Sequence, residues 1–159
     1  MSDPLAEYLH DHLAGSSFAV ELLTTLRDSY KGEPLETFAS ELIAEITKDQ
    51  DLLRRIIERT EKASPDLKEA AAWLAEKVSR LKLRHDHKKG LGTFEALETL
   101  ALGILGKKSL WQALAVVSQM DARVAGFDYE HLIARAHEQY AKVEACRLQV
   151  ALQAFLPAA

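Results

Sequence analysis

The sequence contains a single cysteine, four prolines and seven glycines among its 159 residues. One cysteine excludes an intramolecular disulfide and the thiolate clusters that hold zinc or iron–sulfur centres. No histidine neighbours Cys146 in sequence, so we interpret it as an inert, partly buried thiol. Glycine-rich phosphate loops, nucleophile elbows and zincin motifs do not occur. With no catalytic motif to build on, we favour a protein that is not an enzyme.

Basic segments and long apolar runs are also missing. The net charge is −4, and Lys and Arg are not concentrated as they are on nucleic-acid-binding surfaces. The start, residues 1–4, has no basic stretch followed by an apolar one, and no apolar run approaches the length of a membrane span. We therefore expect a cytoplasmic protein without a nucleic-acid partner or a membrane span, and no small-molecule ligand can be named.

Apolar residues make up 48% of the chain, enough for one domain with a substantial core. The few glycines and prolines fall at joints, and the segments between them have helical rather than alternating periodicity. We predict that residues 1–159 form a single all-α domain. Its architecture is an up-and-down or ferritin-like bundle of four long helices with shorter connecting ones.

Local signals place the first two helices. Asp3 is a favourable N-cap and Pro4 suits a first helical position, so a helix is predicted from Pro4 to about residue 30. A tight link over 31–34 leads into a second helix from residue 34 to about 62. A short link makes the two helices antiparallel neighbours.

Four further features are predicted along the rest of the chain. They are a third helix over about 66–85, a stop and new start at 90–93, a break or sharp kink at 106–109, and a last helix that follows 125–128 and runs to about 156. The segment 110–120 is apolar nearly all round, which predicts deep burial or an oligomer contact around Trp111. A two-fold homodimer is the simplest such assembly.

Two polar residues fall where apolar ones are expected. His12 lies in the apolar stripe of the first helix, and Asp49 lies in that of the second. An unpaired buried charge is costly, and the antiparallel register brings the two within reach of each other, with Glu45 one turn away. Arg147, inside the stripe of the last helix, could complete the charge balance. We interpret His12, Glu45, Asp49 and Arg147 as a polar core layer that fixes helix pairing, and we expect a raised pKa for His12.

The alternative is a metal site inside the bundle. Two-metal bundles need inward Glu-x-x-His pairs, because bridging oxygens and terminal imidazoles must converge. The pair Glu7 and His10 has this spacing but is predicted to point away from the apolar stripe. The complete two-metal motif is therefore missing. What is left is a degenerate or mononuclear iron or manganese site formed by His12, Glu45 and Asp49.

The pattern of long helices resembles the ferritin-like bundles. The resemblance rests on the start Tyr8–Leu9–His10–Asp11–His12, on Glu41, Glu45 and Asp49 of the second helix, and on His137, Glu138 and Glu144 of the last. It implies a four-helix core, a di-iron centre, and roles in iron handling, oxidation or stress response. Two functions follow as hypotheses: a non-enzymatic structural or interaction protein that has lost the metal centre, and a metal-binding ferritin-like protein.

Overall fold

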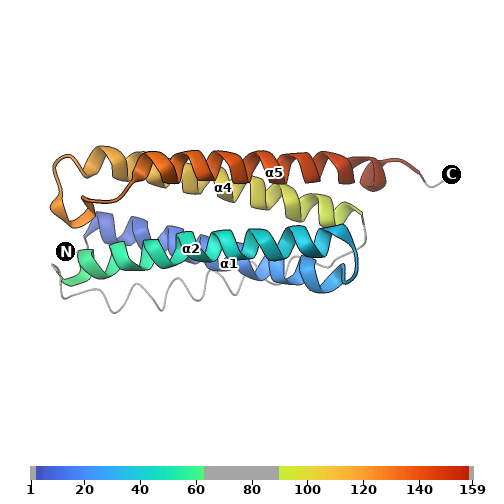
Figure 1. Cartoon of the computed structure of the whole chain (residues 1–159), viewed down its shortest axis with the longest axis horizontal. Coiled ribbons are helices and arrows are strands. Elements are labelled where there is room, and N and C mark those ends of the chain that lie inside the picture. The colour runs from blue at the N-terminus through green and yellow to red at the C-terminus, as the bar shows by residue number, and fades with distance from the viewer. Residues whose placement is uncertain (1–2, 63–89, 158–159) are drawn as a thin grey trace.

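The computed structural model describes residues 3–62 and 90–157, and within these it contains four long helices and no strand. The elements are α1 (Pro4–Ser29), α2 (Pro34–Lys62), α4 (Leu91–Val117), the short 3-10 helix η1 (Ala122–Val124) and α5 (Tyr129–Phe155) (Figure 1). The predicted all-α bundle is confirmed. The predicted helix over 66–85 lies outside the described residues.

Helix ends follow the local capping signals. The Asp3 carboxylate accepts from the backbone N–H of Leu5 at 3.0 Å, which starts α1 as predicted. Asp128 caps α5 in the same way. The link between α1 and α2 turns at Gly32, whose φ of +80° suits a residue without a Cβ. The boundaries predicted for these helices are confirmed to within a residue or two.

The predicted break at 106–109 is wrong, because α4 is continuous through these residues. A mid-helix glycine such as Gly106 costs only about 1 kcal/mol relative to alanine, which packing readily offsets. Ser109 does not cap a new helix; its hydroxyl donates to the carbonyl of Leu105 at 3.1 Å, one turn back. Lys107 is held by partners on two other helices, described below.

The bundle consists of two antiparallel hairpins, α1–α2 and α4–α5, with α1 packed on α4. At one end the hydroxyls of Tyr30 and Thr93 lie 2.6 Å apart. At the other end Arg59 of α2 donates to the carbonyls of Ala122 (2.8 Å) and Ala125 (3.0 Å). These contacts place the start of α4 near the start of α2 and the end of α4 near the end of α2, so α2 and α4 run parallel (Figure 1).

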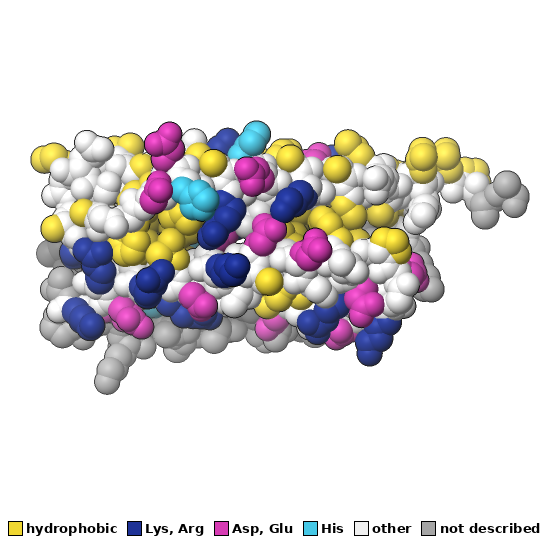
Figure 2. All heavy atoms as spheres, in the orientation of Figure 1, with side chains coloured by type: hydrophobic (Ala, Val, Ile, Leu, Met, Phe, Trp, Pro, Cys, Tyr) yellow, Lys and Arg dark blue, Asp and Glu magenta, His cyan; other side chains and the backbone are white. Residues whose placement is uncertain are grey.

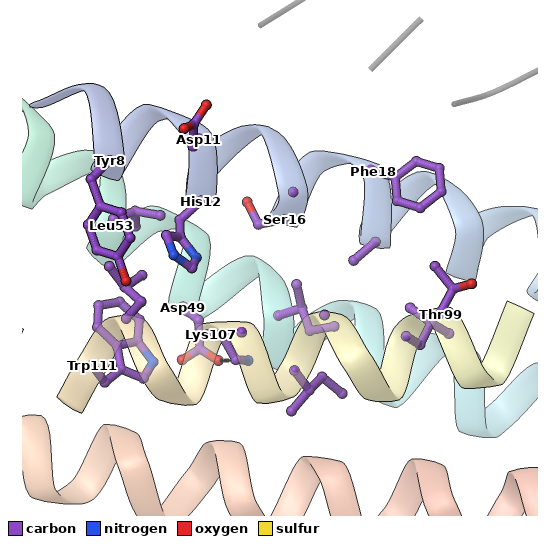
Figure 3. A pocket seen from close by; sticks show the side chains of 18 residues that line it. Tyr8, Asp11, His12, Ser16, Phe18, Asp49, Leu53, Thr99, Lys107 and Trp111 are labelled. Atoms are coloured by element: carbon purple, nitrogen blue, oxygen red, sulfur yellow. Dashed lines mark hydrogen bonds and ion pairs between the residues drawn. The ribbon is translucent and has the colours of Figure 1, made fainter. Parts of the chain in front are cut away.

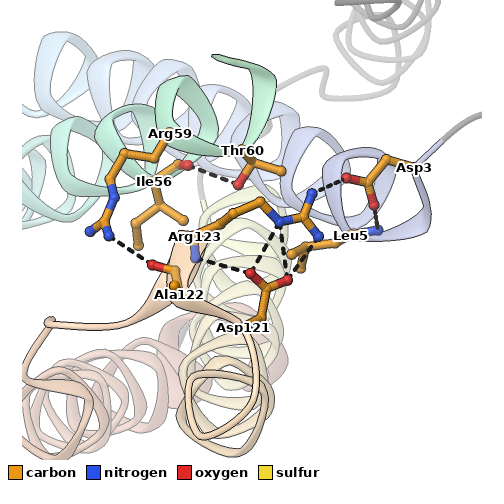
Figure 4. Close-up of polar contacts among 8 residues, drawn as sticks. All are labelled: Asp3, Leu5, Ile56, Arg59, Thr60, Asp121, Ala122 and Arg123. Atoms are coloured by element: carbon orange, nitrogen blue, oxygen red, sulfur yellow. Dashed lines mark hydrogen bonds and ion pairs between the residues drawn. The ribbon is translucent and has the colours of Figure 1, made fainter. Parts of the chain in front are cut away.

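A further polar contact joins the start of α1 to the α4–α5 connection, and we call it the Arg123 latch (Figure 4). Arg123 of η1 pairs with Asp3 at 2.5 Å and with Asp121 at 2.8 Å. Asp3 therefore caps its own helix with one oxygen and binds the other hairpin with the second.

The apolar end of α4 packs mainly within its own chain. Trp111 is 1% exposed and Leu114 is also buried, whereas Val116 and Met120 are 72% and 93% exposed. Deep burial around Trp111 is thus confirmed. By length and composition α4 is the one described helix that could cross a membrane, but core helices of soluble bundles share these properties, so this finding alone assigns no membrane span.

Candidate ligand-binding cavity

Asp49 is the centre of a buried polar layer that joins three helices. Its side chain is 4% exposed. Lys107 of α4 donates to one carboxylate oxygen at 2.6 Å, and Arg135 of α5 donates to the other. Gln139, one turn along α5 and fully buried, donates to Asp49 at 3.3 Å. The buried charge predicted at Asp49 is therefore paired, with one carboxylate between two cations.

Lys107 is the second deeply placed charge of this layer. Its ammonium donates to Asp49 and to the amide oxygen of Gln139, so two of its N–H groups have partners, and the third has none among residues 3–62 and 90–157. Burial lowers the pKa of Lys107, and the carboxylate of Asp49 opposes that effect. The layer thus holds a polar, hydrogen-bonding ammonium among apolar side chains.

Glu45 lies at the edge of the layer rather than at its centre. It accepts from Lys142 at 2.9 Å. Burial raises the pKa of Glu45, but the bonds from Lys142 and Gln139 outweigh this, and the pKa lies below its usual value.

His12 does not pair with Asp49, which corrects the central prediction from the sequence. Its ring points from α1 towards Asp49 and Lys107, as Figure 3 shows, but it packs edge-on against Tyr8, with ring centroids 4.7 Å apart. Burial lowers the pKa of His12, and the nearby Asp11 only partly opposes this. The predicted raised pKa is therefore wrong. The reason is that Asp49 already has two cationic partners, so His12 is left to the desolvation cost of its own burial.

Arg147 is also placed differently from the prediction. It binds Glu144 at 2.7 and 2.9 Å, lies 3.8 Å from Glu98, and stacks over the ring of Phe94. It therefore stabilises the other end of the α4–α5 hairpin and takes no part in the layer around Asp49.

Sequence reasoning missed Lys107 and Arg135, although a signal for each was present. Lys107 lies three residues after Ile104 and four before Trp111, both buried, which places it on the inward face of a continuous helix. Assuming a break at 106–109 concealed this spacing. Arg135 and Gln139 are four residues apart and so share one face of α5.

His10 was predicted to point away from the apolar stripe and is in fact buried. Its imidazole lies 2.7 Å from the carboxylate of Glu61, at the end of α2. The pair joins α1 to α2 and lies apart from the layer around Asp49. Glu7, the first residue of the same Glu-x-x-His sequence, is exposed as predicted.

A partly open cavity of about 460 Å³ lies beside the layer and is lined by residues of α1, α2 and α4 (Figure 3). Small residues create its room: Gly15 and Ser16 on α1, and Gly103 and Gly106 on α4. Apolar side chains form most of the wall, namely Phe18, Ala19, Ile46, Leu53, Leu100, Ile104 and Leu110.

Several polar groups of the cavity gather at one end. His12, Asp49, Lys107 and Trp111 lie together there, whereas Thr99 lies at the other end (Figure 3). The indole Nε1 of Trp111 is buried and has no hydrogen-bond partner within the described part of the chain. An indole nitrogen can only donate, and such a donor normally has a partner when buried. Trp111 therefore supplies an unsatisfied donor among the residues that line this end of the cavity.

The arrangement does not form a metal centre from the residues that the structure describes. His12, Glu45 and Asp49 do not converge, and residues 3–62 and 90–157 contain no group of three or more His, Cys, Asp or Glu side chains that could hold a metal ion. Cys146 is partly buried, and burial raises the pKa of its thiol, which disfavours the reactive thiolate.

No protein-family model, no curated protein and no solved structure matches this chain.

Proposed function

We propose that this chain is a non-enzymatic binding protein for a small, mainly apolar molecule that carries one hydrogen-bond acceptor. The observation that carries the proposal is the buried, unpartnered indole N–H of Trp111 at the polar end of an apolar cavity. Leaving such a donor without a partner costs about 1–3 kcal/mol, which a bound oxygen would recover.

The cavity has the size and chemistry of a ligand pocket. Its volume of about 460 Å³ falls within the range of known small-molecule sites, and His12, Lys107 and Trp111 lie close together at one end of it. The donors there are Trp111 and the remaining N–H of Lys107, while a neutral His12 can donate or accept. A carbonyl, hydroxyl or carboxylate oxygen fits this set, with the apolar body of the ligand along α1 and α4.

A matched pair of probes tests the proposal. Hexanophenone and hexylbenzene differ only in a carbonyl in place of a methylene, and NMR of the Trp111 indole N–H reports binding of each. We expect hexanophenone to bind about tenfold tighter, because it satisfies the buried donor. Failure of both molecules to bind, or equal affinity for the two, would overturn the proposal.

Two variants separate the donor from the apolar wall. Trp111→Phe removes the N–H and keeps an aromatic ring, so it should abolish the preference for the ketone; since it has no indole, its binding is followed through amide signals of α4. Gly103→Leu should fill part of the cavity and weaken both probes. A Trp111→Phe protein that folds and still prefers the ketone would show that the indole is not the recognition group.

Two further proposals concern the type of bundle and a second function: that the bundle is ferritin-like, and that it binds iron or manganese. Support for the former is the parallel course of α2 and α4, since ferritin-like bundles have one long connection between their second and third core helices. Elemental analysis of protein expressed in iron-supplemented medium and purified without a metal-affinity tag tests the latter. Stoichiometric iron or manganese would replace the ligand-binding proposal by the metal-binding one. The cytoplasmic location stays a prediction.

A further inference from the structure

A second hollow lies on the outer side of the layer, between α2 and the start of α5. Its volume is about 380 Å³, and its lining comprises Lys48, Leu52 and Arg55 of α2 together with Gly126, Phe127, Asp128, His131, Leu132 and Arg135. We call it the α2–α5 groove. Figure 2 shows Lys, Arg and His side chains around a hydrophobic hollow over this part of the bundle.

The charge of the groove is predominantly positive. Lys48, Arg55 and Arg135 supply three cations, of which Arg135 is paired with the buried Asp49. The one carboxylate in the lining, Asp128, caps α5 through the backbone N–H of His131 at 3.0 Å. Within residues 3–62 and 90–157, neither Lys48 nor Arg55 forms an ion pair with a carboxylate.

Arg135 is the best-positioned of the three cations. One of its terminal nitrogens is fixed on Asp49, which holds the guanidinium in place, while its Nε is buried without a hydrogen-bond partner in the described structure. A guanidinium has five N–H donors in a planar fork that matches the oxygens of phosphate. Arg135 therefore has a fixed orientation, and the donors that can reach a phosphate in the groove are those of its terminal nitrogens, because Nε is buried.

The floor of the groove is apolar. Leu52, Phe127 and Leu132 line it, and the guanidinium of Arg59 lies 5.1 Å from the centroid of the Phe127 ring. A ligand that fits this surface has a doubly charged oxyanion for the cations and an apolar or aromatic part for the floor.

We propose that the α2–α5 groove binds a small phosphate monoester, with Arg135, Arg55 and Lys48 as the phosphate ligands and Phe127 beneath the ester group. The site is distinct from the cavity between α1, α2 and α4, because Asp49 and its helix separate them. The proposal does not depend on the function assigned to that cavity.

Titration of the protein with phenyl phosphate and with inorganic phosphate, followed through the amide signals of Gly126 and His131, tests it. We expect saturable shifts with both, and tighter binding of phenyl phosphate because its ring covers the apolar floor. Absence of saturable shifts with both anions would overturn the proposal, as would a benzyl alcohol control that binds as tightly as phenyl phosphate.

A pair of neighbouring arginines provides the matched control. Arg55→Gln removes a proposed ligand and should weaken phenyl phosphate about tenfold or more, as expected for a charge-assisted hydrogen bond. Arg54→Gln removes the same charge, but Arg54 pairs with Asp51 at 2.9 Å and does not line the groove. The affinity of this variant for phenyl phosphate should therefore equal that of the wild type. Both positions are exposed, and neither change should impair folding. Equal losses in the two variants would indicate general charge attraction only and overturn the proposal.

Discussion

At the scale of single residues, Asp49 joins helices of both hairpins through its one carboxylate. It links α2 to α4 through Lys107 and to α5 through Arg135. Buried pairs of this kind add little relative to apolar replacements, yet breaking one leaves an uncompensated charge. The stability of the fold should therefore fall when one partner of the pair is removed and change little when both are replaced.

We predict that Asp49→Leu destabilises the protein by about 3 kcal/mol, because the ammonium of Lys107 loses its counter-ion while it stays buried. The double change Asp49→Leu with Lys107→Met should recover most of that loss. Urea unfolding of the single and double variants measures both. Asp51→Asn, at an exposed position, serves as the control and should change stability by less than about 0.5 kcal/mol. Strictly additive effects would contradict the pairing.

His12 gives a prediction about pH. Its pKa in the folded protein lies below the unfolded value of about 6.5, because burial disfavours the imidazolium. The unfolded state therefore binds the proton more readily, so the stability contributed by a neutral His12 is present above pH 6.5 and is lost as the pH falls through the folded pKa. Urea unfolding of the wild type and of His12→Gln across this range should diverge at low pH, by no more than about 1.4 kcal/mol per pH unit. Parallel curves would rule out this role.

How far the sequence predicted the candidate site is clear from these two residues. That Asp49 is buried and paired followed from its place in an apolar stripe, and it is confirmed. The choice of His12 as its partner was wrong. The short link between α1 and α2 allowed only these two helices to be aligned from the sequence, so partners on α4 and α5 could not be placed. Lys107 and Arg135 lie 58 and 86 residues from Asp49, and no local pattern specifies such contacts.

At the scale of elements, α4 is the helix that propensity alone describes least well. It remains continuous through Gly103 and Gly106, and an added Cβ would meet no atom within 4 Å at either position. Its continuity therefore comes from packing and from the partners of Lys107, which offset the weak helix propensity of the two glycines.

Gly103→Ala should accordingly stabilise the protein by about 0.5–1 kcal/mol, since alanine loses less backbone entropy in a helix. Thermal unfolding measures the change. Gly32→Ala is the opposite control: its φ of +80° disfavours a side chain, and the expected loss is about 1–2 kcal/mol. A destabilised Gly103→Ala variant would mean that the small residue is required by a close contact absent from this structure.

At the scale of the whole molecule, the two hairpins share one apolar core, and polar contacts join them at three levels along the bundle. The layer around Asp49 lies midway, the Tyr30–Thr93 bond at one end, and the Arg123 latch at the other. Polar contacts are directional, so they fix how one hairpin sits on the other more narrowly than apolar packing does.

Arg123→Gln tests the latch between Asp3 and η1. Arg123 and its partners are partly exposed, so solvent screens the pair and the expected loss of global stability is only about 1 kcal/mol. The clearer effect is local: hydrogen exchange at the first turns of α1 should accelerate, while the centre of α1 stays protected. Unchanged exchange at the start of α1 would show that the latch does not hold it.

Self-association stays a prediction at this scale. The sequence argument placed the contact around Trp111, which the chain itself buries. The exposed apolar side chains of the α4–α5 hairpin include Val116 and Met120 near that segment, and Leu102, Leu148 and Leu152 elsewhere. Light scattering that gives the monomer mass at micromolar concentration would contradict the predicted homodimer.

The sequence by itself determined the type of the helices and most of their ends, because caps, turns and the 3.6-residue period act over a few neighbouring residues. It also showed that a charge had to be buried at Asp49. Only the tertiary structure decided which cations meet that charge, that α4 continues through 106–109, and that two hollows lie on either side of α2. These features depend on which helix faces meet across the bundle, and the packing of many side chains distant in sequence sets that choice.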